Sequence, residues 1–355
     1  MNYVGLDIHK KTISYCIRSA DGSILREGSL PATRDAIDAW TSSFDGPWVA
    51  GMEATLFTSW VYDHLAEQGV SVKVAHPAML KAIFAGKKKN DCIDARKLAD
   101  LLRCDYFPEC HIASREIRDR RRVLRYRNLL VRQSTQTKNR MSGLLMEAGI
   151  PYNKARLHHS KAYFGQFMDE QKSLMPEALP ALLHLGRNVV EVLTSMDRRL
   201  VRMLQSDAVL ADRVARLMTV PGVGIILALT WALEIGDVRR FPSIKSAVSY
   251  CGLCSAEQSS AGKSQRTPIS KQRNKHLQTT LIEAAKVAPR WHAEFALLYE
   301  REKQRGNRNR ATLALARKLV AYLMAVDRGE RGFEPQPPKP SRTAETPAEK
   351  SSLRA

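Results

Sequence analysis

The first strand that the sequence predicts carries an acid. Tyr3, Val4 and Leu6 make up a short apolar run, and Asp7 follows Leu6 directly. Such a run is typical of a buried strand, where a charged group is costly unless it is paired or bound to a metal ion. Two interpretations stay open: Asp7 is a strand-end residue satisfied by a turn, or it is the first carboxylate of a metal site. The second requires other acids that converge on the same place.

The segments that follow predict a mixed α/β sheet of the ribonuclease-H type, because a hairpin comes first and strand–helix units follow it. The patterns predict strands over residues 12–17, 24–28, 48–52 and 70–75, and helices over residues 34–44, 59–68 and 78–85. The turn signal at residues 20–22 joins the first two of these strands. Glu53 follows the third and is a second acid at the end of a buried strand.

Two further acids open a predicted helix at residue 91. Asp91 and Asp94 lie three residues apart, so they share one helix face, and acids near a helix start are favoured by the helix dipole. From the pattern alone, Asp91 is either a simple N-cap with Asp94 as a first-turn acid, or both are ligands of the site that Asp7 suggests.

The middle of the chain, residues 114–205, predicts long helices. Residues 115–140 hold ten basic residues against Glu116 and Asp119, which favours contact with phosphate groups over a merely solvated face. The apolar stripe predicts an antiparallel helical pair or a coiled-coil arm. A breaker at residues 149–151 and a poorly patterned stretch up to Pro180 precede a second helix over 181–205, which pairs with the first helix or with another subunit.

The second half of the chain predicts more helices around two loops. Gly222 and Gly224 lie in a Pro-Gly-x-Gly turn that enters an apolar helix; this is either a helix-hairpin-helix element, whose free N–H groups hold a DNA phosphate, or a plain tight turn. A polar loop over residues 257–266 precedes helices over 273–288 and 310–326. Residues 327–355 are rich in Pro, Lys, Glu and Ser and predict disorder.

The charge balance favours a polyanionic partner. The 56 Lys and Arg residues exceed the 36 Asp and Glu residues and give a net charge of +20. No apolar run is long enough to cross a membrane, and no signal peptide is evident, so we expect a soluble, cytoplasmic protein. The six cysteines are scattered as reduced thiols would be, and the one C-x-x-C, at Cys251 and Cys254, has no second pair that would complete a zinc site.

Several motifs, which follow one another in the same order along the chain, resemble those of one protein family. VGLDIHK, GMEAT and NDCIDARKLAD, followed by PGVG, RRFPSIKSAVSYCGL, PISKQRNKHLQTTL and ARKL, resemble the transposases with a RuvC-like domain, which include bridge-RNA-guided insertion-sequence recombinases and the pilin-gene inverting recombinase. The resemblance spans about residues 3–326. It departs from the family at Leu56 and Phe57 after GMEAT, and at Ser260-Ala261-Gly262, where the family commonly has Ser-Gly.

The resemblance implies a RuvC-like catalytic domain (1–112) and a mainly helical, serine-bearing transposase domain (207–328). The residue patterns between and after them predict a helical or coiled-coil oligomerisation arm (113–206) and a disordered tail (329–355). The resemblance also implies a D-E-D-D set, Asp7, Glu53, Asp91 and Asp94, that binds Mg²⁺ or Mn²⁺ through oxygen ligands. Ser260 corresponds to the family's nucleophilic serine, with Ser259 as the alternative, and would form a transient phosphoserine.

The implied partners are donor and target DNA and a non-coding guide RNA, and the implied assembly is a homodimer or a homotetramer. The basic residues and turn glycines that we expect to contact nucleic acid are Lys87, Lys88, Lys89, Arg120, Arg121, Arg122, Arg125, Gly222, Gly224, Lys263, Arg266 and Lys271.

Three other functions compete with a recombinase. The nearest is a metal-dependent nuclease of the Holliday-junction-resolvase type, in which water attacks and the serine is idle. An actin-like sugar kinase also begins with a strand, an Asp and a hairpin, but this chain lacks a glycine-rich adenosine loop and is too basic. The last is a nucleic-acid-binding protein without catalysis.

Overall fold

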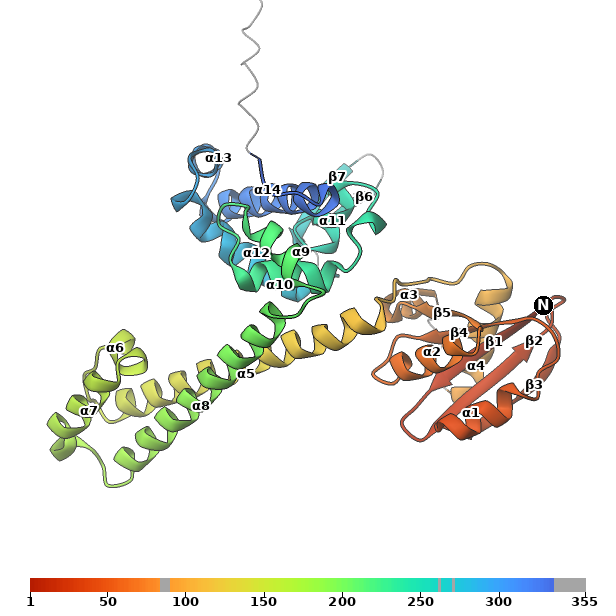
Figure 1. Cartoon of the computed structure of the whole chain (residues 1–355), viewed down its shortest axis with the longest axis horizontal. Helices are drawn as coiled ribbons and strands as arrows, with labels where there is room; N and C mark the ends of the chain where they lie inside the picture. The colour runs from red at the N-terminus through yellow and green to blue at the C-terminus, as the bar shows by residue number, and fades with distance from the viewer. Residues whose placement is uncertain (84–89, 261–262, 270–271, 335–355) are drawn as a thin grey trace, which may run out of the picture. The chain divides into compact units, whose positions relative to one another are not determined.

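The computed structural model describes residues 1–83, 90–260, 263–269 and 272–334; of residues 256–260 and 263–268 it describes the backbone alone. The chain divides into two compact units, Met1–Arg115 and Glu116–Ala355; the first is coloured red to orange in Figure 1. Within the described residues, no helix combines the length and the apolar composition that crossing a membrane requires.

The sheet of the first unit has five strands in the order β3-β2-β1-β4-β5. The strands are β1 (Asn2–Ile8), β2 (Thr12–Arg18), β3 (Ile24–Pro31), β4 (Trp48–Glu53) and β5 (Ser71–Ala75). The first three are antiparallel neighbours, whereas β4 pairs in parallel with β1 and β5. The predicted mixed α/β class is therefore confirmed, with the hairpin and the parallel strands in one sheet.

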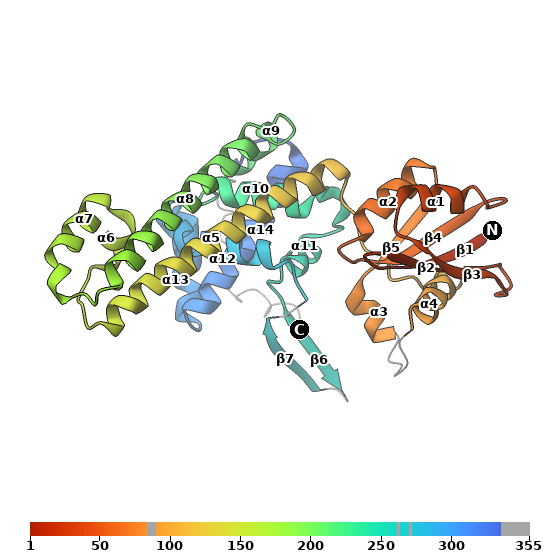
Figure 2. The same cartoon turned by 90° about the horizontal axis from the view of Figure 1, so that it is seen from below.

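Helices cover both faces of this sheet (Figure 2). On one face lie α1 (Arg34–Thr41) and α2 (Thr58–Glu67), whose buried side chains Ile37 and Val61 join Leu6 and Met52 in a single apolar cluster. On the other face lie α3 (Pro77–Ile83) and α4 (Asp91–Arg103). The side chains of β1 point alternately to these two faces, because successive side chains of a strand point to opposite sides.

Two glycines allow α4 to lie directly on the sheet. A Cβ atom at Gly5 would be 2.0 Å from the carbonyl oxygen of Ala95, and one at Gly51 would be 2.7 Å from Cδ1 of Leu102. At Gly5 only glycine fits, because the added atom would meet the backbone of the helix, and at Gly51 the side chain of Leu102 would have to shift. The position of α4 is thereby fixed against β1 and β4, the two strands that carry Asp7 and Glu53.

In the second unit, α5 (Arg115–Glu147) and α8 (Leu179–Gln205) form an antiparallel pair, side by side in both overall views (Figures 1 and 2). Arg127 Nε donates to Asp197 Oδ1 at 2.5 Å, and farther along the pair Gly186 lies against Met141, whose Cγ would be 2.8 Å from an added Cβ. The helix predicted over 181–205 thus pairs with the first helix of its own chain.

The segment between these helices, which was expected to be poorly patterned, consists largely of short helices. It contains α6 (Lys154–His159), α7 (Lys161–Glu170) and the short 3₁₀ helix η1 (Lys172–Leu174). Asn153 and Ser160 cap α6 and α7 by accepting from the backbone N–H groups of Arg156 and Tyr163. Phe167 and Leu157 are buried with Leu183 of α8 in one cluster, so short, well-capped helices close this end of the arm.

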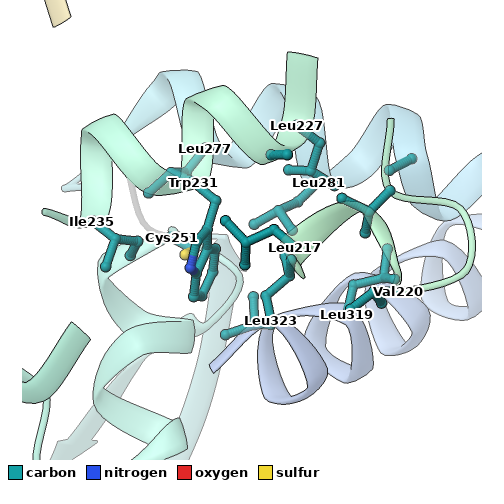
Figure 3. Packing of buried hydrophobic residues seen from close by; sticks show 14 of the residues in the cluster. Leu217, Val220, Leu227, Trp231, Ile235, Cys251, Leu277, Leu281, Leu319 and Leu323 are labelled. Carbon is teal, nitrogen blue, oxygen red and sulfur yellow. The ribbon is translucent and has the colours of Figure 1, made fainter. Parts of the chain in front are cut away.

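The remaining elements form a helical domain around α10. They are α9 (Ala211–Met218), α10 (Ile225–Ile235), η2 (Val238–Arg240), α11 (Ile244–Tyr250), β6 (Ser255–Ser260), β7 (Lys263–Ile269), α12 (Lys275–Val287), η3 (Ala288–Arg290), α13 (Ala293–Gln304) and α14 (Arg308–Gly329). Because α10 is apolar apart from Thr230 and Glu234, it has to be buried, and every residue from Leu227 to its last, Ile235, is buried. Figure 3 shows Trp231 packed between Leu277 of α12 and Leu323 of α14.

The last helix extends beyond its predicted end at Val326. Asp327 belongs to α14, and its carboxylate, 4% exposed, pairs with Arg213 at 2.7 Å and accepts from Trp231 Nε1 at 2.9 Å. Disorder predicted from residue 327 is therefore wrong for this part of the chain. After the helix, Phe333 packs against Tyr322 with ring centroids 4.8 Å apart. Residues 335–355, most of the expected tail, lie outside the described residues.

Candidate metal site and serine hairpin

Asp7 and Glu53 lie on neighbouring strands at the same level of the sheet. Leu6 pairs with Met52 in the parallel β1–β4 ladder, so the next residue of each strand is one of the two acids. Asp7 shares its face with Gly5, and Glu53 shares its face with Gly51, because side chains two apart in a strand point the same way. Both acids therefore belong to the face that α4 covers.

The first turn of α4 lies over the same end of the sheet. Asn90 is the N-cap and accepts from Cys92 N, so Asp91 is the first helical residue and not the cap, which corrects one of the two sequence interpretations. Ala95 is in contact with Gly5. From this contact, Asp91 lies four residues back along the helix, a distance of about 6 Å. Asp7 lies two residues further along the strand, a distance of about 6.6 Å. Because the two distances are nearly equal, the two acids lie close together.

Asp7, Asp91 and His9 bring their possible metal-ligand atoms close together. One ligand atom of each lies within 4.8 Å of the other two. His9 Nε2 is 3.2 Å from Asp7 Oδ2 and 3.4 Å from Asp91 Oδ1. Asp94 lies one turn further on and accepts from Lys97 Nζ at 2.9 Å. The sequence analysis missed His9, because a histidine two residues after Asp7 does not indicate a metal site until the fold brings Asp91 beside it.

The negative charge of Asp7 is energetically unfavourable when no cation is bound beside it. Its side chain is 15% exposed; burial raises the pKa of Asp7, and the negative charges of Asp91 and Asp94 raise it further, against an opposing effect of His9. A carboxylate in this environment is stabilised by a cation, and oxygen ligands suit hard divalent ions. The residues of this site thus fit a divalent metal ion.

The serines lie on a two-stranded ribbon and not in the polar loop that the sequence predicted. β6 and β7 pair in antiparallel fashion, with Ser259 opposite Ser264 and Ser260 opposite Lys263. Ser260 is the last residue of β6, next to residues 261 and 262, which lie outside the described residues. The mostly polar residues of both strands masked the strand pattern here. Arg266 lies on β7 opposite Glu257.

The base of this serine hairpin (β6 and β7) is anchored in the helical domain. Just before β6, the carbonyl oxygens of Gly252 and Leu253 accept from Gln278 Nε2 at 2.6 Å and from Arg317 Nε at 2.8 Å. Gly252 has φ +70°, and a Cβ there would be 2.4 Å from Cβ of Arg273. The hairpin therefore leaves the domain from a fixed point.

The Pro-Gly-x-Gly turn joins α9 to α10, and its two glycines differ. Gly222 has φ +80°, and a Cβ would be 2.7 Å from Cβ of Ala288, so the turn and its packing require glycine. Gly224 is the N-cap of α10, and a Cβ added there would meet no described atom within 4 Å. The geometry leaves Gly224 open to a ligand and gives Gly222 a structural role.

Most of the arginines expected to contact nucleic acid have partners within the second unit. Arg120 pairs with Asp207 at 2.8 Å, Arg121 donates to the carbonyl oxygen of Leu233 at 2.9 Å, and Arg125 donates twice to Glu234, at 2.8 Å each. Arg122 is 67% exposed and pairs with Asp119 of its own helix. Lys87, Lys88, Lys89 and Lys271 lie outside the described residues, and of Lys263 only the backbone is described.

Two family models match the chain. Residues 4–150 match the DEDD transposase model of the IS110 type, described as "Transposase". Residues 214–300 match the model described as "Transposase IS116/IS110/IS902 family". The first match contains all four acids and the second contains the serine hairpin, in the order that the motifs predicted.

Individual relatives give the same result. The chain is 27% identical to the "Transposase for insertion sequence element IS1328" of Yersinia enterocolitica over 249 residues, which cover 68% of this chain and 71% of the relative. It is 27% identical to the "Probable family 20 transposase" of Pseudomonas aeruginosa over 81% of this chain and 86% of the relative. It is 24% identical to the "Transposase for insertion sequence element IS1111A" of Coxiella burnetii over 78% of this chain and 76% of the relative.

The mixed sheet, the acid cluster and these matches together define a DNA transposase or recombinase. The protein is thus an enzyme, its substrate is DNA, and the DEDD type indicates that it uses a divalent metal ion. The two family models and the relatives together support an IS110-type DEDD transposase.

Proposed function

We propose that the protein cuts and rejoins the DNA of an insertion sequence with metal-bound Asp7, Glu53, Asp91 and Asp94 and with Ser260 as the nucleophile. The observation that carries this proposal is the approach of Asp7 to Asp91 at the first turn of α4. These residues are 84 positions apart in the sequence (91 − 7). The fold brings their two negative charges together, and a bound cation would compensate the repulsion between them.

The proposed metal ion is Mg²⁺ or Mn²⁺. When bound, such an ion polarises a phosphate oxygen and neutralises charge that develops during phosphodiester exchange. Asp7 and Asp91 would hold it directly. Asp94 would complete the helix side, since its charge already acts on Asp7, and Glu53 would complete the β4 side, since it follows Met52 at the level of Asp7.

The proposed serine step exchanges one phosphate ester for another. The Oγ of Ser260 forms a bond with the phosphorus atom and loses its proton to a base, a P–O bond to deoxyribose breaks, and the leaving sugar oxygen takes up a proton. A serine hydroxyl needs such activation because it is a weak nucleophile at its free pKa. Rejoining is the reverse step on another strand end and needs no hydrolysis.

A covalent adduct tests this step. The parent protein and Ser259→Ala, incubated with donor and target DNA and the metal ion, should form a denaturation-resistant protein–DNA adduct, and Ser260→Ala should not. Binding of DNA by Ser260→Ala should persist in a mobility-shift assay. Loss of the adduct in Ser259→Ala alone would transfer the role to Ser259.

The alternative is a nuclease of the Holliday-junction-resolvase type. One observation favours it: all four acids lie in the first unit, whereas Ser260 lies in the second, so water activated at the acids would suffice for cleavage. The same assay separates the two functions, because a nuclease yields free 5′-phosphate ends, no adduct, and equal cleavage by Ser260→Ala and the parent.

We further propose a guide RNA, a cytoplasmic location and an oligomeric assembly. The guide RNA rests on the family resemblance alone, and co-purification of a transcript from DNA flanking the gene would test it. Oligomer formation is supported by α8, where apolar residues spaced three, four or seven apart face solvent. They are Leu182, Leu185, Val189, Val192, Met196 and Met203, and a second arm would cover them as in a coiled coil.

A further inference from the structure

We propose that His9 is a direct ligand of the divalent ion and makes this site prefer Mn²⁺ to Mg²⁺. The proposal rests on the metal site described above and adds a residue outside the D-E-D-D set. Nε2 of His9 lies close to both flanking carboxylates, at 3.2 Å from Asp7 Oδ2 and 3.4 Å from Asp91 Oδ1. An ion that binds both oxygens would therefore lie beside this nitrogen.

The backbone of His9 is fixed by the turn between β1 and β2. His9 directly follows the last residue of β1, and its N–H donates to the carbonyl oxygen of Thr12 at 2.9 Å, which closes the turn to β2. The ring is about half exposed, with 48% of the side chain accessible. It is thus positioned by the hairpin and open to an ion that arrives from solvent.

The chemistry of the ligand decides which ion is preferred. A neutral imidazole with its proton on Nδ1 presents the Nε2 lone pair to a metal ion. Carboxylates alone suit Mg²⁺, Ca²⁺ and Mn²⁺, whereas imidazole favours transition ions. Mg²⁺ also keeps much of its water shell. One nitrogen among oxygen ligands therefore shifts the site towards Mn²⁺.

The test measures binding of Mn²⁺ alone to the full-length protein. We would record pulsed EPR spectra of the Mn²⁺ complex and titrate Mn²⁺ and Mg²⁺ by calorimetry, for the parent, His9→Gln and His64→Gln. His64 is the matched control, because it also pairs with an acid, Asp38, at 2.7 Å in the same unit but lies outside the acid cluster. Thermal melting confirms that each variant is folded.

We expect nitrogen hyperfine coupling to Mn²⁺ in the parent and in His64→Gln, and its loss in His9→Gln. Labelling with [¹⁵N]histidine should shift the coupling. Mn²⁺ binding should weaken about tenfold or more in His9→Gln, whereas Mg²⁺ binding should change by less than about threefold, since the glutamine amide supplies an oxygen.

Two results would overturn the proposal in different ways. If Mn²⁺ binds to the parent without nitrogen coupling, or with coupling that persists in His9→Gln, His9 is only a hydrogen-bond partner of Asp7, and the four-acid site stands. If neither ion binds to the folded parent, the metal site of the proposed function fails together with the role of His9.

Discussion

Arg125 and Glu234 lie 109 positions apart in the sequence and form a two-fold ion pair, with both N···O distances at 2.8 Å. The Glu234 side chain is fully buried, and its Oε2 also accepts from Asn274, the N-cap of α12, at 2.8 Å. One buried carboxylate thus connects α5, α10 and the segment that follows the serine hairpin.

Replacing Glu234 by Gln should lower the free energy of unfolding by about 3 kcal/mol or more, because the guanidinium groups of Arg125 and Arg121 lose their buried counter-charge. Denaturant unfolding measures the change. Arg122→Ala is the control: it removes an exposed pair with Asp119 and should cost at most about 1 kcal/mol. Equal effects of the two variants would contradict a structural role of this pair.

The contribution of Glu234 should also depend on pH. Burial would raise the pKa of Glu234, but hydrogen bonding and the charge of Arg125 outweigh burial, so the pKa lies below its ordinary value. An acid with a lowered pKa stabilises the fold above its ordinary value of about 4.3, and that contribution is lost as the pH falls through the lowered pKa. The stability gap between the parent and Glu234→Gln should therefore be constant near neutral pH and narrow below about pH 4.

Asp7→Asn should stabilise the metal-free protein at neutral pH. Burial and the repulsion of Asp91 and Asp94 raise the pKa of Asp7, so the charged form costs stability above that pKa and the cost disappears below the ordinary value of about 3.9. Thermal melting should show a higher midpoint for the variant than for the parent without metal. Added Mn²⁺ should raise the midpoint of the parent and leave that of Asp7→Asn nearly unchanged.

Gly5→Ala should disturb the acid site without touching an acid. The added methyl group would meet the carbonyl oxygen of Ala95 at 2.0 Å, and α4 would have to move away from β1, at a cost of about 1–3 kcal/mol or more. Metal-dependent stabilisation should weaken as Asp91 withdraws from Asp7. Gly143→Ala, in α5 with no neighbour within 4 Å, should instead stabilise its helix by up to about 1 kcal/mol.

The exposed stripe of α8 should govern assembly. Leu185 and Val192 are 61% and 52% exposed, and the double variant Leu185→Glu and Val192→Glu should give a monomer by light scattering. Arg198→Glu places the same carboxylate on another side of α8 and should keep the assembly of the parent. An unchanged mass of the double variant would place the subunit contact elsewhere.

The first unit was largely predictable because its signals are local. Apolar runs and turn residues predict the strands of the sheet, and parallel strands bring Asp7 and Glu53 to the same level whatever the loops between them. The second unit was less predictable from the sequence. The charge excess of residues 115–140 predicted contacts with phosphate for Arg120 and Arg125, because few acids are near them in the sequence. Their partners Asp207 and Glu234 come from distant parts of the chain.

Two further differences have physical causes. The serine hairpin has few of the β-branched and aromatic residues that mark strands, so backbone pairing alone defines it. His9 was missed because a histidine beside a strand end is uninformative until Asp91 is brought to it by α4.

The anchored base of the serine hairpin has a consequence for altering the enzyme. The main-chain oxygens of Gly252 and Leu253 hold the foot of the ribbon, and each residue added to both strands extends it by about 3.3 Å. Inserting matched pairs into β6 and β7 would therefore change how far Ser260 reaches while the helical core keeps its stability. In the proposed function, the length of the ribbon therefore sets which position on the DNA Ser260 can reach.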